Sequence, residues 1–117
     1  MLIFPLKKQW YEKIKSGKKT VVYREVKLYW IKRINKLIQQ HNYIHDYSAV
    51  DFSRLDALTK NVIFKIPMHC YLQLGYNPAA RLKADIIKIE IVDGKDTDLH
   101  IDKPVYAIHL KDVREVT

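Results

Sequence analysis

The sequence predicts an α+β fold in which about five to six mostly antiparallel strands curl into a β-barrel with two or three helices. Two helical patterns come early in the chain, and the long stretches rich in β-branched residues come after them. Strands that follow helices in this way pair mainly with one another, which disfavours alternating parallel units. Hydrophobic residues make up 48% and charged residues 29% of the chain, a balance typical of one globular domain over residues 1-117.

The N-terminal segment predicts a short strand and a helix. Residues 2–6 are apolar and suit a buried strand. Trp10 and Ile14 then repeat at helical spacing, and Gly17 is a natural C-terminal stop, so we expect a helix over residues 8–16.

A second strand and a second helix follow. Residues 20–26 are rich in β-branched and aromatic side chains, which favours a strand. Trp30, Ile34 and His41 lie on one helical stripe, so we expect a helix over residues 28–40. The opposite face of this helix is basic, with Lys32, Arg33 and Lys36.

The middle of the chain is harder to assign. Residues 41-60 are polar and aromatic without a sustained period, so we interpret them as an insertion or loop, with a short helix over residues 54–59. Residues 61–66 and 68–74 predict two strands separated by Pro67.

The strongest strand signal covers residues 80–92. The apolar alternation there slips by one residue at Ile86 and Ile87, so that Ile87, Ile89 and Ile91 continue the core stripe. Such a slip predicts a β-bulge that bends the strand around a barrel corner. Residues 105–110 predict the final strand.

Positive charge is concentrated in the first third of the chain. Residues 1–36 carry eleven Lys or Arg side chains against two Glu, whereas the remaining 81 residues carry 10 basic and 11 acidic ones. The formal net charge of +8 therefore arises near the N-terminus. A one-sided positive field attracts polyanions. The clustering of the basic side chains favours nucleic acid as the partner. The alternative is a lysine-rich solvated surface without a specific partner.

Three features predict a cytoplasmic protein with no membrane partner. The apolar run at residues 1–6 is short and precedes Lys7 and Lys8, the reverse of a signal peptide. No stretch approaches the roughly 20 apolar residues of a membrane span. The single cysteine, Cys70, cannot form an internal disulfide and fits a reducing compartment.

The residues after the first predicted helix resemble the ASCH family of the PUA-like superfamily. Its members carry a Gly-x-Lys-x-x-Glu-x-Arg signature that leads into a strand, and Gly17, Lys19 and Arg24 stand at three of those four positions. The lead-in at residues 6–11 is similar to small bacterial and phage members. The resemblance implies a PUA-like barrel with Lys19 and Arg24 at a cleft, and we expect RNA as the nucleic acid there.

The signature glutamate is replaced by Val22. Some family members hydrolyse acetylated cytidine with a Lys, a Thr and a Glu; their Thr aligns with Val22, which we expect on the cleft floor. Valine cannot act as nucleophile, acid or base, so we assign no catalytic residue and lean against an enzyme. The alternative is an ASCH-type hydrolase of RNA or of a modified nucleoside, a ribonuclease or an acetylcytidine amidohydrolase, using Lys19 with some other acid or base.

The predicted binding surface combines cations with aromatic rings. Lys19 supplies a point charge and Arg24 a planar fork for phosphate. Tyrosines supply faces on which bases stack, although each alone also suits a half-buried strand position. The predicted nucleic-acid-binding residues are Lys8, Lys19, Thr20, Tyr23, Arg24, Lys32, Lys36 and Tyr76.

Other constellations do not predict a site. His41 and His45 are four residues apart with only Asp46 nearby, so we interpret them as surface or capping histidines and expect no metal and no cofactor. Cys70 suits a small core residue, next to an outward-facing His69. A third hypothesis, a small basic protein whose partner is another protein, stays open, as does the oligomeric state.

Overall fold

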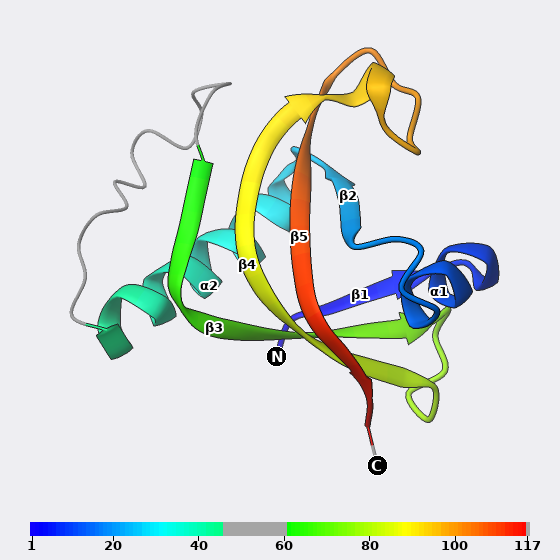
Figure 1. Cartoon of the computed structure of the whole chain (residues 1–117). Helices are drawn as coiled ribbons and strands as arrows, with labels where there is room; N and C mark the ends of the chain where they lie inside the picture. Colours follow the sequence, from blue (N-terminus) through cyan, green and yellow to red (C-terminus); the bar gives the residue numbers. More distant parts are fainter. Residues whose placement is uncertain (46–60, 117) are drawn as a thin grey trace.

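The computed structural model describes residues 1–45 and 61–116, which form a curled sheet with helices (Figure 1). The elements in chain order are β1 (Ile3–Leu6), α1 (Lys8–Lys15), β2 (Val21–Glu25), α2 (Leu28–His45), β3 (Asn61–Leu74), β4 (Arg81–Asp93), the 3-10 helix η2 (Gly94–Asp96) and β5 (Pro104–Glu115). The predicted α+β class, with a curled and mostly antiparallel sheet, is confirmed. Among the described residues no helix is long and apolar enough to cross a membrane.

The sheet has five strands in the order β1-β3-β4-β5-β2. The pair β1 and β3 is parallel, and the other three pairs are antiparallel. Strands β1 and β2 are therefore the two edges, although they flank the same helix α1 in the chain. Because β4 and β5 are long and strongly curved, the sheet wraps toward α2, which passes behind it in Figure 1.

The bend in β4 lies where the sequence predicts it. The register with β5 shifts between Lys83 and Asp85 and again between Ile86 and Lys88. The expected core stripe holds at Ile89, which is buried, but it is wrong at Ile87, which is 42% exposed. The bulge explains the difference, because the extra residue of a bulge leaves the regular alternation of faces.

Strand β3 corrects the prediction of two strands. It is continuous, and Pro67 lies in its irregular stretch, where the register with β4 shifts between Ile63 and Met68. Strand β1 pairs with β3 only from Tyr71 onward. Proline has no N–H to donate to a ladder, so an unpaired stretch at a bend accommodates it without breaking the strand.

Helix α2 runs to His45 rather than ending near Gln40. The prediction of His41 as a surface or capping residue is wrong, because His41 is fully buried against the ring of Phe64, with 5.2 Å between ring centroids. Its Nε2 atom accepts a hydrogen bond from the backbone N–H of Ile66 at 3.4 Å. The rest of the predicted insertion, including the short helix over residues 54–59, lies outside the described residues.

The core lies between the curled sheet and the two helices. Helix α2 contributes Trp30, Ile34 and Ile38, and α1 contributes Tyr11 and Ile14. Alternate residues of the strands complete the cluster, which includes Cys70 as predicted, while the neighbouring His69 is exposed.

Candidate nucleic-acid interface

A cavity of about 530 Å³ opens where the end of β1, the starts of α1 and α2, and the loop before β5 meet. Its lining includes Lys7, Trp10, Arg24, Trp30, Asp98 and Leu99. We call this cavity the Trp cleft, because both tryptophans of the chain line it. Its volume falls within the range of small-molecule sites in proteins. It combines charged groups of both signs with two indole rings, of which Trp30 is only 7% exposed.

Arg24 lies in this cleft between two aromatic rings. Its guanidinium carbon is 5.5 Å from the ring centre of Phe4 and 5.3 Å from that of Trp30. Burial lowers the pKa of Arg24 to about 10, which still leaves it charged at neutral pH. Within residues 1–45 and 61–116, no carboxylate forms an ion pair with it.

The same guanidinium links the two edge strands. Nη2 donates a hydrogen bond to the carbonyl oxygen of Pro5 in β1 at 2.6 Å, and Nη1 donates to its neighbour Tyr23 in β2 at 2.8 Å. Charge-assisted hydrogen bonds of this kind are stronger than neutral ones. Arg24 therefore has a structural role at the opening of the sheet as well as a place in the cleft wall.

Lys19 stands beside the cleft and forms an ion pair with Asp98. Its ammonium also lies 5.2 Å from the ring centre of Trp10 and 4.9 Å from that of Tyr23. Burial lowers the pKa of Lys19, and the charges of Lys13 and Arg24 act in the same direction. The Asp98 carboxylate opposes this shift, because a negative charge stabilises the ammonium.

The loop before β5 fixes the position of Asp98. The buried Thr97 donates its hydroxyl hydrogen bond to the carbonyl of Gly94 at 2.9 Å and accepts one from the N–H of Leu99 at 3.2 Å. Gly94 in turn donates its N–H to the carbonyl of Lys103 at 2.8 Å. A Cβ atom on Gly94 would stand only 2.6 Å from that carbonyl oxygen, so only glycine fits here.

Val22 does not lie on the cleft floor as expected. It is 1% exposed and belongs to the hydrophobic core. Side chains alternate between the two faces of strand β2, and that of Val22 lies on the inner face, where the core buries it. Val22, at the position where the ASCH signature has a glutamate, therefore has a packing role in the core.

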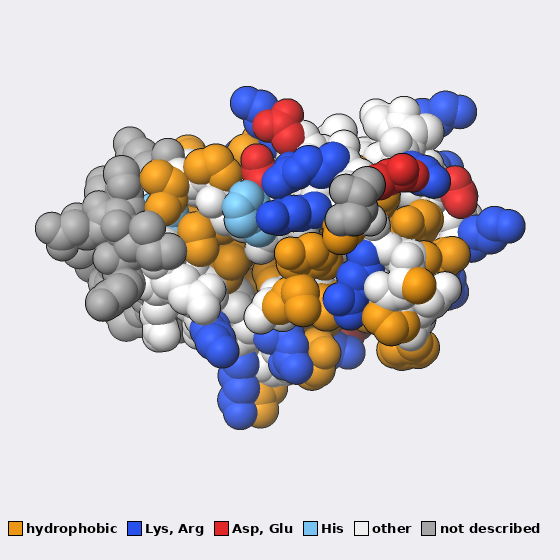
Figure 2. All heavy atoms as spheres, turned by 90° about the horizontal axis from the view of Figure 1, so that it is seen from below, with side chains coloured by type: hydrophobic (Ala, Val, Ile, Leu, Met, Phe, Trp, Pro, Cys, Tyr) orange, Lys and Arg blue, Asp and Glu red, His pale blue; other side chains and the backbone are white. Residues whose placement is uncertain are grey.

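A second cavity, of about 520 Å³, lies along α2. Its lining includes Lys32, Arg33, Lys36 and Gln40 of α2 and His69 of β3. We call it the α2 hollow. Met1 and Leu2 also line it. Figure 2 shows the molecule from below. On that face, Lys and Arg side chains gather around exposed hydrophobic ones.

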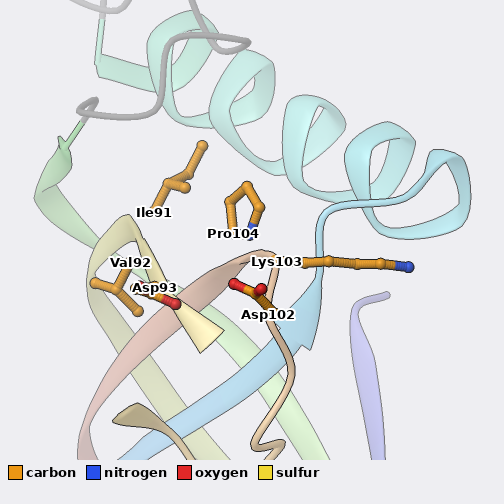
Figure 3. A pocket seen from close by; sticks show the side chains of 6 residues that line it. All are labelled: Ile91, Val92, Asp93, Asp102, Lys103 and Pro104. Atoms are coloured by element: carbon orange, nitrogen blue, oxygen red, sulfur yellow. The ribbon is translucent and has the colours of Figure 1, made fainter. Parts of the chain in front are cut away.

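A third cavity, of about 310 Å³, differs in charge from the other two. The residues Ile91, Val92, Asp93, Asp102, Lys103 and Pro104 line it. Figure 3 shows the Lys103 side chain extending away from the two carboxylates. Carboxylates repel phosphate, so this cavity is poorly suited to a nucleic-acid strand.

The predicted binding residues divide into separate groups. Lys19, Tyr23 and Arg24 meet at or beside the Trp cleft, and Thr20 is exposed next to Lys19. Lys8 is exposed in the first turn of α1. Lys32 and Lys36 line the α2 hollow instead, and Tyr76, 92% exposed on the turn after β3, lines none of the three cavities.

Sequence reasoning missed Asp98, Trp10 and Trp30 as site residues. Both tryptophans have the spacing of core helix residues, and only their scarcity marks them, since the chain has two. Asp98 is 79 positions from Lys19 in the chain, and no local pattern signals their contact.

Cys70 is a buried core residue and not a reactive thiol. Burial raises the pKa of the Cys70 thiol to about 12, and the charge of Asp85 adds to this shift. The thiolate is the nucleophile, so this thiol is inert at neutral pH. Residues 1–45 and 61–116 contain no cluster of three or more His, Cys, Asp or Glu side chains suited to a metal ion.

Comparison with known proteins gives no relative for this chain. No family model matches it, and searches of curated proteins and of solved structures likewise find no match.

Proposed function

We propose that the protein is a nucleic-acid-binding module, with RNA as its ligand, whose Trp cleft accepts one unstacked base or nucleotide. The observation that carries the proposal is the cleft itself, where two indole rings and the guanidinium of Arg24 line one cavity of about 530 Å³. Single-stranded RNA is recognised mainly by stacking of splayed bases on aromatic and guanidinium planes. The same side chains in a purely structural role would not need a cavity beside them.

Exposed lysines would hold the phosphates around this cleft. Lys7, Lys8 and Lys18 are exposed, and none of them has an ion-pair partner among the described residues. Unpaired ammonium groups release counterions on binding to phosphate, which supplies much of the affinity of proteins for nucleic acids.

The resemblance to the ASCH signature supports the same location. Gly17, Lys19 and Arg24 are the matching positions, and the last two lie at or beside the Trp cleft. The curled five-stranded sheet is consistent with the PUA-like barrel that this resemblance implies. We propose membership of the ASCH family on these grounds.

Binding of labelled RNA and DNA oligonucleotides across a salt series tests this proposal. The logarithm of affinity falls with the logarithm of salt at about −0.7 per phosphate contact for single strands. Four contacts predict about a 50-fold loss of affinity from 50 to 200 mM salt. Affinity that does not depend on salt would contradict the proposal and indicate a neutral ligand or a protein partner.

A hydrolase is the second candidate, and the Lys19–Asp98 pair favours it. An acid and a base in contact beside a cavity are the groups that general acid–base chemistry uses, and the pKa of Lys19 is lowered. The pair would replace the carboxylate that Val22 lacks. We expect the RNA to be intact after the binding assay. We also expect acetylcytidine to be unchanged after incubation with the protein. Turnover that Lys19→Ala abolishes would establish the hydrolase instead.

A further inference from the structure

A continuous series of contacts between rings and guanidinium groups connects the Trp cleft with the α2 hollow. Arg24 packs on Trp30 in the cleft, and the ring of Trp30 meets that of Tyr29 edge-on, with 4.8 Å between centroids. The guanidinium carbon of Arg33 lies 3.5 Å from the ring centre of Tyr29. Because Arg33 also lines the α2 hollow, these contacts together connect the two cavities.

The outer part of this series is accessible to a ligand. Tyr29 is 50% exposed and Arg33 is exposed. A hydrogen bond from Arg33 Nη1 to the carbonyl oxygen of Tyr29, at 3.1 Å, holds the pair in place. The Arg33 guanidinium covers one face of the exposed Tyr29 ring. Aromatic rings and guanidinium planes both allow a nucleic-acid base to stack, a mode that tolerates any base.

The charge around this route is positive. Lys32 and Lys36 line the α2 hollow and have no ion-pair partner among the described residues. None of the described residues that line the hollow is acidic. The hollow therefore offers two or more free donors to a phosphate at the far end of the series.

We infer that a single strand leaves the Trp cleft over the Tyr29–Arg33 stack and places a phosphate in the α2 hollow. This inference rests on the proposed function and adds the form of the ligand and its path. From Trp30 to Lys36 the helix rises about 9 Å, which equals two to three stacked nucleotide steps of about 3.4 Å. The smallest ligand that fills the whole path therefore has about three to four nucleotides. A duplex cannot follow it, because paired bases are not free to stack on Tyr29.

The length of the ligand tests the path. Fluorescein-labelled RNA oligonucleotides of mixed sequence, from one to eight nucleotides, would be titrated by fluorescence anisotropy at 50 mM salt. We expect affinity to rise steeply up to about four nucleotides and little beyond, and a duplex of eight base pairs to bind at least about 10-fold more weakly than its single strand. A duplex that binds as tightly as the single strand would overturn the inference.

Variants of the stack test the residues. We expect Tyr29→Ala to weaken binding of the tetramer by about 5- to 150-fold, the effect of losing one stacked base. Tyr29→Phe should keep most of the affinity, because the ring remains. Binding of the mononucleotide should not change in either variant, because it fills only the Trp cleft. Ile63→Ala is the control, because this apolar side chain of β3 is 63% exposed, comparable to the 50% of Tyr29, and lies outside the series.

Two failures are distinguishable. If no RNA or DNA of any length binds, the proposed function is wrong and the path falls with it. If the tetramer binds and responds to Lys19→Ala, but Tyr29→Ala and Arg33→Gln bind it as tightly as the natural protein, only the path is wrong. Loss of affinity in both stack variants, with Lys88→Ala unchanged, supports the path, because Lys88 is an ion-paired lysine of β4 outside the series.

Discussion

Arg24 shows how one side chain serves both the fold and the site. It lies between the rings of Phe4 and Trp30 and donates hydrogen bonds to carbonyl oxygens in both edge strands. Surface cations that hold only phosphate have no such partners. Variants of Arg24 should therefore affect stability as well as binding, and the two effects have to be measured separately.

We predict that Arg24→Ala lowers the free energy of unfolding by about 2–3 kcal/mol, from the lost charge-assisted hydrogen bonds and the lost packing on two rings. Urea unfolding at pH 7 measures this loss. Arg33→Ala is the control, because its contacts with Tyr29 are exposed and their loss should cost only about 0.5–1 kcal/mol. Equal stability of the two variants would show that Arg24 does not hold the edge strands together.

Asp98 places a negative charge where a polyanion is expected. We predict that Asp98→Asn binds RNA about 1.4- to 5-fold more tightly, because it frees Lys19 from an ion pair whose strength is about 0.2–1 kcal/mol. Anisotropy titration of the same RNA measures this change. Asp102→Asn on the same loop, where the partner is Lys95, removes an equal charge away from the cleft and serves as the control. Weaker binding by Asp98→Asn than by Asp102→Asn would show that Asp98 contacts the ligand directly.

Among the elements, β4 determines how far the sheet curls. Its register with β5 shifts twice, and the second shift leaves Ile87 between the paired residues Ile86 and Lys88. The bulge turns the side chain of Ile87 partly to solvent while its neighbour Ile86 stays fully buried. Two adjacent isoleucines therefore have different roles.

We predict that Ile86→Ala lowers the free energy of unfolding by about 2–5 kcal/mol, the cost of truncating a buried isoleucine. Ile87→Ala should lower it by less than about 1 kcal/mol, because that side chain is 42% exposed. Urea unfolding of both variants compares adjacent residues of the same type. Similar losses at the two positions would contradict the bulge.

Some features of the helices and strands could be predicted from the sequence, and others could not. The slip from Ile86 to Ile87 and the basic face of α2 are local patterns, and both could be predicted, although the slip wrongly places Ile87 in the core stripe. Pro67 misled the prediction, because proline usually ends a strand and only the irregular pairing with β1 and β4 accommodates it here. The burial of His41 depends on Phe64, which comes from another element.

At the scale of the whole molecule, the site depends on contacts between distant segments. The Trp cleft needs β1, both helices and the loop before β5 to meet. Lys19 and Arg24 could be predicted as candidate residues from a short motif, whereas Asp98 could not, because only the closure of the sheet brings it to Lys19. Lys32 and Lys36 were predicted as phosphate contacts, but their place in a separate hollow depends on where α2 packs.

The distribution of charge follows from the same arrangement. The basic first third of the chain supplies β1, α1, β2 and the first turns of α2, which surround the Trp cleft and part of the α2 hollow. The carboxylates Asp93 and Asp102 line the third cavity instead. The α2 hollow therefore suits a polyanion better than the third cavity does.

RNA bound in the Trp cleft would lie against the indole rings, so intrinsic tryptophan fluorescence reports whether the cleft is occupied. Both tryptophans of the chain line that cleft, so every indole signal reports on it. Titration with an unlabelled RNA tetramer should give saturable quenching, with the same affinity as the anisotropy assay, because a base that stacks on an indole changes its emission. Binding in the anisotropy assay without any change in tryptophan emission would show that the RNA lies elsewhere on the protein, which would contradict a role of the Trp cleft in binding.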